Sequence, residues 1–447
     1  MNVFPMSIQL RDYQLDMLAR LDAAWKRHRS VLVQMPTGTG KTVLLAEAIR
    51  KLKIENEKLK IGSPGAVLVV AHRKELIEQI RQCIIDHSPF IIVESIQKLS
   101  KCIDEAAFEP SLVIVDEAHH ALAKTYRMLW ERWPKARFLG LTATPCRLSG
   151  EAFTDLFDVL LQSWNIQAFI DKGYLSDFEY VSARPDSEAM RRIRSLRKRG
   201  ADGDYQTKEM AAVMDVPESI AHLYDTYHAF ADGRKGIVYA IDRQHAQHVA
   251  AFYQERGVKC CVIDSRTPAK EREQMVEDYR EGRLDVLVNV DIFSEGFDCP
   301  EVEFIQLARP TLSLSKYLQQ VGRGMRVSEG KPHVLILDNV GLYQTFGLPT
   351  DERDWQRMFF GKDAGKGCTN LSRCVIQNDE MQEKELVALE MVRIKSGGRK
   401  WAGLEVFVQG DRYGVMRNGR VTCPARFKRI ERLEKQSGFF ALGIYQS

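Results

Sequence analysis

Several signals that would place the chain in a special class are missing. No stretch of its 447 residues approaches the ~18 consecutive apolar residues that a membrane-spanning helix requires. The nine cysteines are scattered and odd in number, which does not fit the paired framework of a small secreted protein. The N-terminal sequence MNVFPMSIQLRDYQ lacks a basic segment followed by an apolar run. We therefore expect a cytoplasmic protein with no membrane partner.

A large excess of one charge is missing too. The chain carries 64 Lys and Arg residues against 60 Asp and Glu residues, a net charge of +4. This small excess does not by itself predict a nucleic-acid partner, although a single groove could still be basic. Hydrophobic residues make up 45% and charged residues 28%, both ordinary for a globular protein. The length predicts about three domains.

The most informative segment is Met35–Thr42, which reads MPTGTGKT. An apolar strand is predicted before it at 31–34 (VLVQ), and a helix is predicted after it at 43–52. This order of strand, glycine-rich turn, Lys-Thr and helix is typical of a loop that binds phosphate. The full pattern has a Gly five residues before Gly40, where this chain has Met35. The alternative is an ordinary turn between a strand and a helix, which the TGTGKT sequence disfavours.

Each residue type in this loop has a chemical task. Gly38 and Gly40 let successive backbone N–H groups point inward at an anion, and the following helix adds the positive end of its dipole. Lys41 would reach the β- and γ-phosphates of a nucleotide, and the Thr42 hydroxyl would bind Mg²⁺. The predicted phosphate-binding set comprises Pro36, Thr37, Gly38, Thr39, Gly40, Lys41 and Thr42.

Two carboxylates follow another apolar strand, 112–115 (LVIV), in the sequence Asp116-Glu117-Ala118-His119. The carboxyl ends of parallel strands are where ligands bind in such sheets. Asp116 would therefore hold Mg²⁺, and Glu117 would take a proton from an attacking water. The alternative is an acid-rich helix N-terminus, which is common in proteins. The neighbouring phosphate-binding loop favours the functional interpretation.

Two further pairs of polar residues are suited to contact a nucleotide. Thr142 and Thr144 follow the next predicted strand, where they would sense a phosphate or carboxylate or, alternatively, cap a helix. Arg11 and Gln14 lie one turn apart on a helix predicted at 10–24, and a Gln amide matches the edge of adenine. Spacing alone favours a solvated helix face for this pair.

Strands alternate with helices along most of the chain, which predicts an α/β protein with doubly wound parallel sheets. The first series runs from residue 31 to about residue 141. A second series starts near residue 236 and lacks a phosphate-binding loop, which leaves room for a nucleotide between two domains. Its strands are predicted at 237–240, 261–263, 286–290, 304–307 and 334–337.

Basic residues are concentrated at two places in the second half. Gln319, Arg323 and Arg326 lie in QQVGRGMR, where arginines could stabilise a transferring γ-phosphoryl group from across a cleft. A basic helix end that complements its own dipole is the alternative. The segment 189–199 (AMRRIRSLRKR) has six basic residues, which could contact nucleic-acid phosphates. A solvated face or an inter-domain connector explains that segment slightly better.

Seven segments follow one another along the chain, namely LRDYQ, MPTGTGKT, VLVVAHRKEL, DEAH, TATP, VLVNVDIFSEGFDCP and QQVGRGMR. In this order they resemble the motifs of a superfamily 2 helicase of the DEAH-containing type. The resemblance covers residues 10–340 and is greatest to bacterial RadD-type repair ATPases and to the translocase subunits of restriction enzymes. It implies two tandem RecA-like domains, ATP and Mg²⁺ as cofactors, and a nucleic-acid partner. The domains are expected at 1–183 and 223–345, with a basic inter-domain segment at 184–222.

The resemblance also implies a role for each matching residue. Gln319, Arg323 and Arg326 join the catalytic set, with Arg326 favoured as the arginine finger. Gln14 and Arg11 would recognise adenine. Two residues of SEGFDCP would face the ribose or the cleft, namely Gly296 and Asp298. Three residues would couple hydrolysis to domain motion, namely His119, Thr142 and Thr144. Five would line the nucleic-acid path, namely His72, Arg73, Ser95, Arg243 and Asn289.

The chain after residue 345 departs from these motifs, and we expect a connector at 346–398 and a β-rich module at 399–447. Cys368 and Cys374 form one close cysteine pair, but a zinc site needs two, so we predict no zinc. The dipeptide Asn418-Gly419 predicts a hairpin turn, and RYGVMRNGRVTCPARFKRI resembles one unit of a WG-type β-repeat. A single such unit buries little surface, so we expect it to dock on the motor or on a protein partner.

The sequence therefore predicts an ATP-dependent helicase or translocase, with DNA, single-stranded or duplex, preferred to RNA by resemblance only. Two alternatives stay open. One is a restriction-type translocase that moves on duplex DNA without separating its strands. The other is a switch ATPase that binds nucleic acid and recruits a partner through its C-terminal module. The intact set of Lys41, Asp116, Glu117, Arg323 and Arg326 argues against an inactive scaffold.

Overall fold

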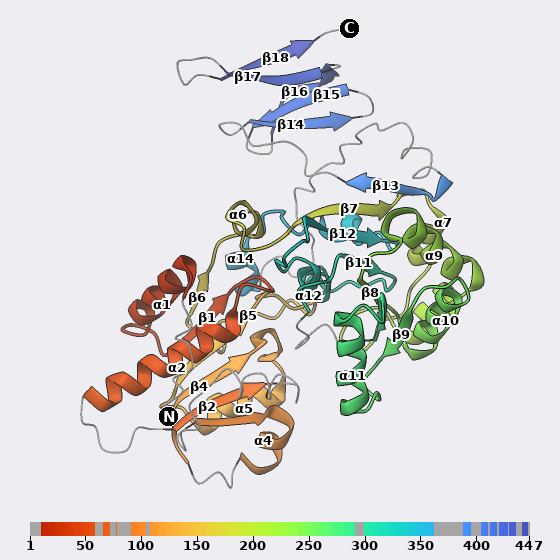
Figure 1. Ribbon diagram of the computed structural model, residues 1–447. Helices are drawn as coiled ribbons and strands as arrows, with labels where there is room; N and C mark the ends of the chain where they lie inside the picture. Colours follow the sequence, from red (N-terminus) through yellow and green to blue (C-terminus); the bar gives the residue numbers. More distant parts are fainter. Residues whose placement is uncertain are drawn as a thin grey trace.

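The computed structural model describes residues 10–58, 66–71, 77, 91–103, 108–290, 299–361 and 388–394, and the strands between residues 404 and 445. Two parallel sheets lie side by side, and α12 (Leu314–Gly324) lies between them (Figure 1). Two small antiparallel sheets follow towards the C-terminus. The predicted α/β class, with two parallel sheets and a β-rich C-terminal module, is confirmed.

The first sheet has six parallel strands in the order β3-β2-β4-β5-β1-β6. Its central strands are continuous apolar runs, as expected where helices cover both faces and leave no solvated side. Every residue of β1 is buried. The strands are β1 (Ser30–Gln34), β2 (Ala66–Ala71), β3 (Ile91–Ser95), β4 (Pro110–Asp116), β5 (Arg137–Thr142) and β6 (Val159–Gln162).

The strand order of the first sheet gathers three of the predicted motifs. Because β4, β5 and β1 are neighbours, the segments that follow them emerge at one edge of the sheet. These segments hold the Asp-Glu pair, the two threonines and the phosphate-binding loop. The helices of this part of the chain are α1 (Asp12–Ala24), α2 (Lys41–Lys58), α4 (Ile96–Cys102), the 3₁₀ helix η2 (Ala118–His120), α5 (Lys124–Arg132) and α6 (Ile166–Asp171).

The second sheet has seven strands in the order β13-β7-β12-β11-β8-β10-β9, of which only β13 is antiparallel to its neighbour. Its strands are β7 (Asp177–Ala183), β8 (Gly236–Tyr239), β9 (Cys260–Ile263), β10 (Val286–Asn289), β11 (Phe304–Leu307), β12 (His333–Asp338) and β13 (Met391–Ile394). Its helices besides α12 are α7 (Glu188–Arg194), α8 (Thr207–Met214), α9 (Pro217–Ala231), α10 (Arg243–Gln254), α11 (Ala269–Arg280) and α13 (Leu342–Phe346).

The strand pairing corrects the expected domain boundaries. The expected boundary at residue 183 is wrong, because β7 pairs along its whole length with β12 of the second sheet. The expected inter-domain segment 184–222 is not a linker, since α7, α8 and part of α9 lie there and bury residues such as Met190 and Ile220. The expected connector 346–398 contributes β13 to the edge of the second sheet.

The chain also returns from the second sheet to the first. Helix α14 (Trp355–Phe359) packs beside β6, where the Gln356 Nε2 donates to the Leu160 carbonyl at 3.2 Å. The backbone N–H of Phe153 donates to the carbonyl of Phe359 at 2.8 Å. The two units are therefore joined twice, once before β7 and once by this returning segment.

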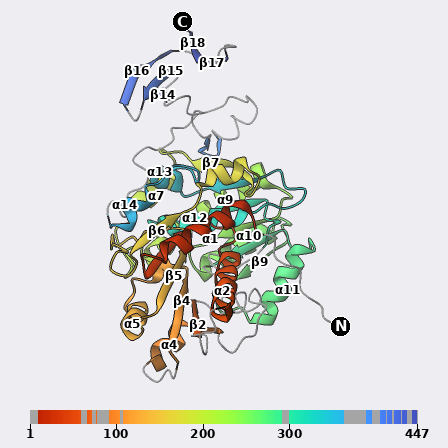
Figure 2. The ribbon, with the colours of Figure 1, turned by 90° about the vertical axis from the view of Figure 1, so that its left-hand side faces the viewer.

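The C-terminal strands form a three-stranded sheet, β14-β15-β16, and a two-stranded sheet, β17-β18. In Figure 1 they lie beyond β13, away from the first sheet, and Figure 2 shows them at the opposite end of the molecule from α4 and α5. Their bounds are β14 (Leu404–Gln409), β15 (Arg412–Arg417), β16 (Arg420–Phe427), β17 (Arg429–Glu434) and β18 (Phe440–Tyr445). The predicted hairpin is present, because β15 pairs with β16 up to Arg417 opposite Arg420. Its turn residues, Asn418 and Gly419, lie outside the described residues, as do Cys368 and Cys374.

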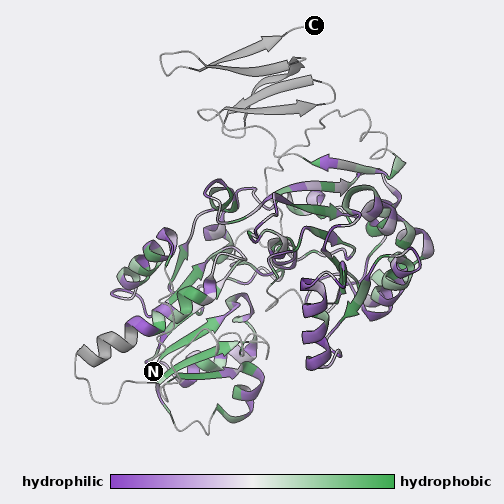
Figure 3. Ribbon diagram, in the orientation of Figure 1, coloured by the Kyte–Doolittle hydropathy of each residue, from purple (hydrophilic) through white to green (hydrophobic). Residues whose placement is uncertain are grey.

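Hydrophobic residues are concentrated in the strands of both parallel sheets, whereas outward-facing helices such as α11 are hydrophilic (Figure 3). One buried cluster continues from α1 and α2 of the first sheet into the second sheet. A second cluster fills the opposite face of the first sheet, under α4 and α5. Among the described residues, no helix has both the length and the apolar character to cross a membrane.

Candidate active site at the junction of the two sheets

The loop after β1 is a tight turn that depends on two glycines. Gly38 has φ +84° and Gly40 has φ +80°, values that favour glycine. A Cβ on Gly40 would come within 2.6 Å of the Gln14 Nε2. The loop is also held from α1, because the Tyr13 hydroxyl donates to the Thr39 carbonyl at 2.9 Å. This geometry fits a loop whose backbone N–H groups surround an anion.

Met35, which stands where the usual pattern has glycine, belongs to the core. Its side chain is fully buried, and its backbone N–H donates to the Thr142 carbonyl at 2.9 Å. This residue therefore extends β1 beside β5, and the turn itself begins after it. The departure from the sequence pattern leaves the two conformationally important glycines in place.

Lys41 and Thr42 begin α2 directly after the turn. The Lys41 Nζ lies 3.4 Å from the Met35 carbonyl oxygen, so the side chain folds back over the loop. Burial lowers the pKa of the Lys41 ammonium below its ordinary value, and the carboxylates of Glu117 and Asp116 oppose this effect. The ammonium thus faces the two acids across the loop.

Asp116 ends β4, and Glu117 follows it in a left-handed backbone conformation with φ 48° and ψ 51°. For a residue other than glycine this conformation costs ~1 kcal/mol or more, and such strain is typical of functional sites. Both carboxylates are buried. Burial raises the pKa of the Glu117 carboxyl, but the charge of Lys41 and the hydrogen bond with His119 outweigh burial and lower that pKa to about 2.

The residues predicted to couple hydrolysis to motion form one chain of polar contacts. The His119 Nδ1 lies 3.3 Å from the Glu117 Oε2 and 3.3 Å from the Thr142 Oγ1. The Thr144 backbone N–H donates to the Thr142 Oγ1 at 3.1 Å. The Thr144 hydroxyl then donates to the Ser315 hydroxyl of α12 at 2.7 Å. The chain of contacts therefore runs from an acid of the first sheet to a helix of the second unit.

Helix α12 presents one face to the first sheet. Ser315, Gln319 and Arg323 are spaced four residues apart, which places them on the same side of the helix. The Gln319 Nε2 donates to the Glu117 Oε2 at 3.3 Å, and Arg323 is buried nearby, where its charge lowers the pKa of Glu117. Sequence reasoning did not identify Ser315, because a serine in a helix carries no distinguishing local signal.

The same helix touches the phosphate-binding loop directly. A Cβ on Gly322 would lie 2.7 Å from the Thr37 Cβ, so only a glycine lets the helix approach this closely. Arg326, just after the helix, lies over the loop, since its Cγ is 3.2 Å from the position of a Cβ on Gly38. The structure therefore brings Gln319, Arg323 and Arg326 to the loop and the acids, although they come from the other unit.

The pair predicted to recognise adenine lies at the start of α1. The Gln14 Oε1 accepts a hydrogen bond from the Arg11 backbone N–H at 3.0 Å, and the Gln14 Nε2 faces Gly40. The Arg11 guanidinium lies 4.9 Å from the centre of the Tyr174 ring, and the Tyr174 hydroxyl donates to Asp12. Gln14 is thus part of the site rather than a residue of a solvated helix face, and Tyr174 is a neighbour that the sequence did not indicate.

The residues predicted along the nucleic-acid path are dispersed. Arg243 lies in an open groove of about 730 Å³ after β8 and β9, where its Nε pairs with the Asp264 Oδ2 at 2.7 Å. Ser95 caps α4 by accepting a hydrogen bond from the Lys98 backbone N–H at 3.2 Å. Asn289 is fully buried at the end of β10 and does not reach the surface. His72, Arg73, Gly296 and Asp298 lie outside the described residues.

The basic segment 189–199 makes mainly internal contacts. Arg191 and Arg192 pair with Glu188 at 2.8 and 3.2 Å. The backbone N–H groups of Arg197 and Lys198 both donate to Glu209. These contacts match the interpretation of the segment as a solvated helix face.

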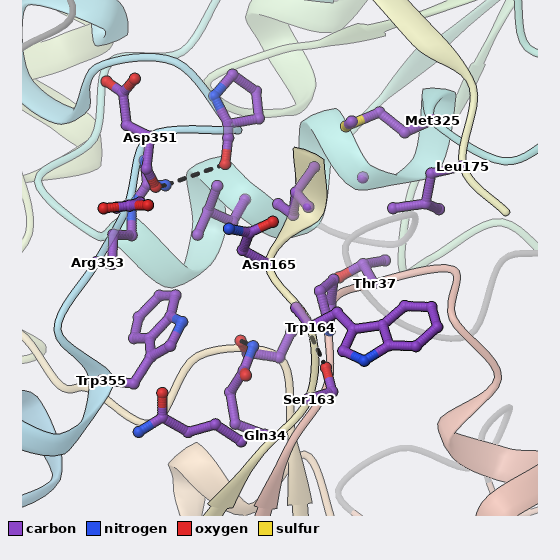
Figure 4. A pocket seen from close by; sticks show the side chains of 18 residues that line it. Gln34, Thr37, Ser163, Trp164, Asn165, Leu175, Met325, Asp351, Arg353 and Trp355 are labelled. Atoms are coloured by element: carbon purple, nitrogen blue, oxygen red, sulfur yellow. Dashed lines mark hydrogen bonds between the residues drawn. The ribbon is translucent and has the colours of Figure 1, made fainter. Parts of the chain in front are cut away.

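A separate cavity of about 240 Å³ lies behind the phosphate-binding loop. Figure 4 looks into it, with Arg353 and Trp355 of the returning segment on one side and Trp164 and Leu175 on the other. Thr37 of the loop also lines the cavity. Leu318 and Gly322 of α12, and Met325 directly after this helix, line it as well. The cavity is therefore lined by residues of both units and of the returning segment.

Two family models match the segments of the chain that hold the two halves of the candidate site. Residues 7–89 and 83–147, which hold the loop and the acids, match the family described as "Type III restriction enzyme, res subunit". Residues 218–328, which hold α12, match the family described as "Helicase conserved C-terminal domain".

Individual proteins are also similar to this chain. A 51.5 kDa protein of a Lactococcus phage is 34% identical over 76% of this chain and 72% of its own length. The Saccharomyces cerevisiae protein named "Putative ATP-dependent helicase IRC3" is 28% identical over 74% of this chain, which spans 51% of the yeast protein. A fragment of a putative HsdR subunit of a type I restriction enzyme from Vibrio vulnificus has a similar fold, with a TM-score of 0.58 at 22% identity over 77% of this chain and 67% of that one.

The chain belongs to the superfamily 2 helicases. Its two parallel sheets are the RecA-like domains of that family, and the chain is an ATP-hydrolysing enzyme of the nucleic-acid-dependent kind.

Proposed function

We propose that the chain is an ATP-dependent DNA motor, a helicase or translocase, in which hydrolysis between the RecA-like domains drives movement along nucleic acid. The observation that carries this proposal is the double contact of α12, which reaches the Glu117 carboxylate through Gln319 and the loop residue Thr37 through Gly322. A site shared by two domains changes when the domains move, so ATP binding and hydrolysis are coupled to their motion.

The residues of the loop fit a nucleoside triphosphate with Mg²⁺. The compact turn places the Lys41 ammonium beside it, and the Thr42 hydroxyl and the Asp116 carboxylate are oxygen ligands of the kind that Mg²⁺ prefers. When bound, the metal neutralises charge on the β- and γ-phosphates. Gln14 recognises the adenine edge, while Arg11 and Tyr174 offer it a stacking surface.

In this proposal the chain's own residues divide the work of hydrolysis. Glu117 is ionised at neutral pH, because its pKa is low, and accepts a proton from the attacking water. Gln319 holds that carboxylate in place. Arg323 and Arg326 stabilise negative charge on the transferring phosphoryl group. His119, Thr142 and Thr144 carry the state of Glu117 to Ser315 on the other domain.

Steady-state ATP hydrolysis tests the proposal, measured alone and with single-stranded DNA, duplex DNA or RNA. We expect stimulation by DNA, and Glu117→Gln should abolish it. Stimulation by RNA only would overturn the preference for DNA. Hydrolysis indifferent to every nucleic acid would contradict the motor and favour a switch ATPase that responds to a protein partner, for which the strands β14–β18 offer a docking module.

A duplex-DNA translocase that does not separate strands is the second candidate. It is supported by the match of residues 7–147 to a restriction-enzyme subunit family. Two assays distinguish the candidates, namely displacement of a third strand from a triplex and unwinding of a forked duplex. Triplex displacement without unwinding would favour the translocase, and unwinding would favour the helicase.

A further inference from the structure

A short turn, Gly200–Tyr205, connects α7 to α8 and ends beneath α12. Arg199 and Tyr205 form an antiparallel bridge at its base, and the Arg199 guanidinium lies 4.5 Å from the centre of the Tyr205 ring. The Gly200 backbone N–H donates to the Asp204 carbonyl at 2.8 Å. The turn is therefore a closed unit that presents Asp204 at a defined position.

The Asp204 carboxylate grips the start of α12. It is 1% exposed, and it accepts hydrogen bonds from the Thr311 hydroxyl at 2.7 Å and the Leu312 backbone N–H at 2.7 Å. The Lys316 Nζ pairs with it at 2.9 Å. Burial raises the pKa of this carboxyl, but the charge of Lys316 and the donors outweigh burial and hold the pKa below its ordinary value. These charge-assisted contacts hold the carboxylate and the start of α12 in one arrangement.

The residues that Asp204 binds also fix the N-terminal end of α12. The Ser313 backbone N–H donates to the Thr311 hydroxyl at 3.0 Å, and Ser313 is the N-cap of α12. From this cap the helix runs without interruption through Ser315 and Gln319 to Arg323. A helix of 11 residues moves as a rod, so a shift at its first turn also shifts the two residues beside Glu117.

The turn also contacts the first domain. A Cβ on Gly203 would lie 3.4 Å from the Leu148 Cδ2, and Leu148 follows the Thr142–Thr144 segment. The turn is thus located where α12, its cap and the first domain meet. The Asp204 carboxylate contacts the start of α12 rather than the loop or the acids, so we expect its effect on hydrolysis to pass through α12.

We propose that Asp204 is a positioning residue for ATP hydrolysis, which fixes α12 so that Gln319 and Arg323 meet Glu117. The inference rests on the proposed function, because it assumes that these three residues act in hydrolysis. It assigns a role to the turn between α7 and α8, which no sequence motif indicated. Displacement of catalytic groups by about 1 Å can cost up to ~100-fold in rate, so a small shift of the helix is enough.

The experiment compares Asp204→Asn with Asp202→Asn as the matched control. Asp202 is in the same turn and its side chain is 61% exposed at 3.2 Å from the same Lys316 Nζ, so its charge contributes little. We measure kcat and KM for ATP, and the Kd of a fluorescent ATP analogue, with the nucleic acid that stimulates the wild type. For Asp204→Asn we expect kcat to fall roughly 10- to 100-fold while Kd changes less than about threefold. Asp202→Asn should resemble the wild type.

A double-mutant cycle with Arg323→Ala separates positioning from general loss of structure. If Asp204 acts through α12, Asp204→Asn should cause a smaller fold-loss of kcat in the Arg323→Ala background than in the wild type, because only Gln319 is then left to be displaced. Thermal melting should show both variants folded at the assay temperature. An unchanged kcat in Asp204→Asn, an equal loss of kcat and ATP affinity, or fully multiplicative losses would overturn the inference. Wild-type protein that does not hydrolyse ATP would instead contradict the proposed function.

Discussion

At the residue scale, Glu117 combines strain, burial and charge in one side chain. Its left-handed backbone is held by contacts from both domains, since His119 and Gln319 both reach its carboxylate. A position that keeps an unfavourable conformation within so many contacts is suited to a reaction step rather than to stability.

Glu117→Gln therefore removes a proton acceptor without changing side-chain volume. We expect kcat for ATP hydrolysis to fall by about 10²- to 10⁴-fold, the usual contribution of a general base, while ATP binding is retained. Phosphate release and nucleotide titration measure the two quantities. Glu151→Gln is the matched control, because that carboxylate is half exposed and pairs with Arg147 and Ser149, away from the loop and the acids. Loss of ATP binding in Glu117→Gln would contradict the assigned role.

His245 is a second residue whose environment has a testable consequence, namely a dependence of protein stability on pH. It is buried on α10, where its Nδ1 accepts a hydrogen bond from the Ile241 backbone N–H at 3.1 Å, and burial lowers its pKa to about 4. Between pH 6.5 and 4 the unfolded chain therefore binds more protons than the native protein, so stability falls as the pH decreases.

Replacement by Gln should remove this dependence. We expect the wild type to lose about 2 kcal/mol more stability than His245→Gln between pH 7.5 and 5, from the difference between a pKa of 6.5 and one of about 4. Urea unfolding at the two pH values measures the change. His228→Gln, which removes an exposed imidazole on α9, should behave like the wild type. An equal loss in all three proteins would show that His245 is not the titrating group.

At the element scale, α12 is the part on which the site depends. Its N-terminal end is held by Asp204. At its C-terminal end the Lys331 Nζ donates to the Gly324 carbonyl at 2.9 Å. Between these ends the helix meets the first domain at Ser315, Gln319 and Gly322. The helix is therefore anchored at both ends in its own domain, and its contacts in between depend on where the first domain lies.

Gly322→Ala tests how closely α12 must approach the loop. The added methyl would lie 2.7 Å from the Thr37 Cβ, a branched atom close to the backbone that cannot swing away. We expect the helix to be pushed outward and kcat to fall about 10-fold or more, whereas ATP binding by Lys41 and the loop changes little. ATP hydrolysis and nucleotide titration measure both effects. A variant with wild-type kcat would mean that the two domains separate during turnover.

At the scale of the whole molecule, the two domains share one continuous hydrophobic cluster. The second domain also extends further along the chain than its helicase motifs. β13 pairs with β7, and just before it the Glu390 carbonyl accepts a hydrogen bond from the Arg184 backbone N–H at 2.8 Å. The Glu390 carboxylate accepts another from the Glu188 backbone N–H at 2.7 Å. This segment therefore belongs to the motor.

Two truncations separate the motor from its C-terminal module. A chain ending at residue 398 keeps β13, and we expect its ATP hydrolysis to stay within about twofold of the wild type, because each small sheet pairs only its own strands. A chain ending at residue 387 loses β13 and leaves the edge of β7 unpaired, and we expect its melting temperature to fall by roughly 4 °C or more. Thermal melting and ATP hydrolysis test both. Loss of turnover in the longer truncation would make the strands β14–β18 part of the motor.

Much of the fold could be predicted from the sequence, because its signals are local. Apolar runs indicated most strands of both sheets, and these were found within one or two residues, but no strand was predicted where β6, β7 and β13 lie. The boundaries were less accurate. β7 and β13 join the second sheet by pairing with a distant strand and with each other, a choice that neither short strand encodes alone.

By itself the sequence determined the class of the protein and the chemistry of its phosphate-binding loop, since both depend on short segments whose residue types dictate backbone conformation. Only the tertiary structure decided how the site is completed. Gln319 meets Glu117 across 202 positions of sequence, and Thr144 meets Ser315 across 171. Asp204 reaches Thr311 across 107 positions. Such contacts depend on how two sheets and one helix pack together, and packing follows from the whole set of buried side chains rather than from any motif.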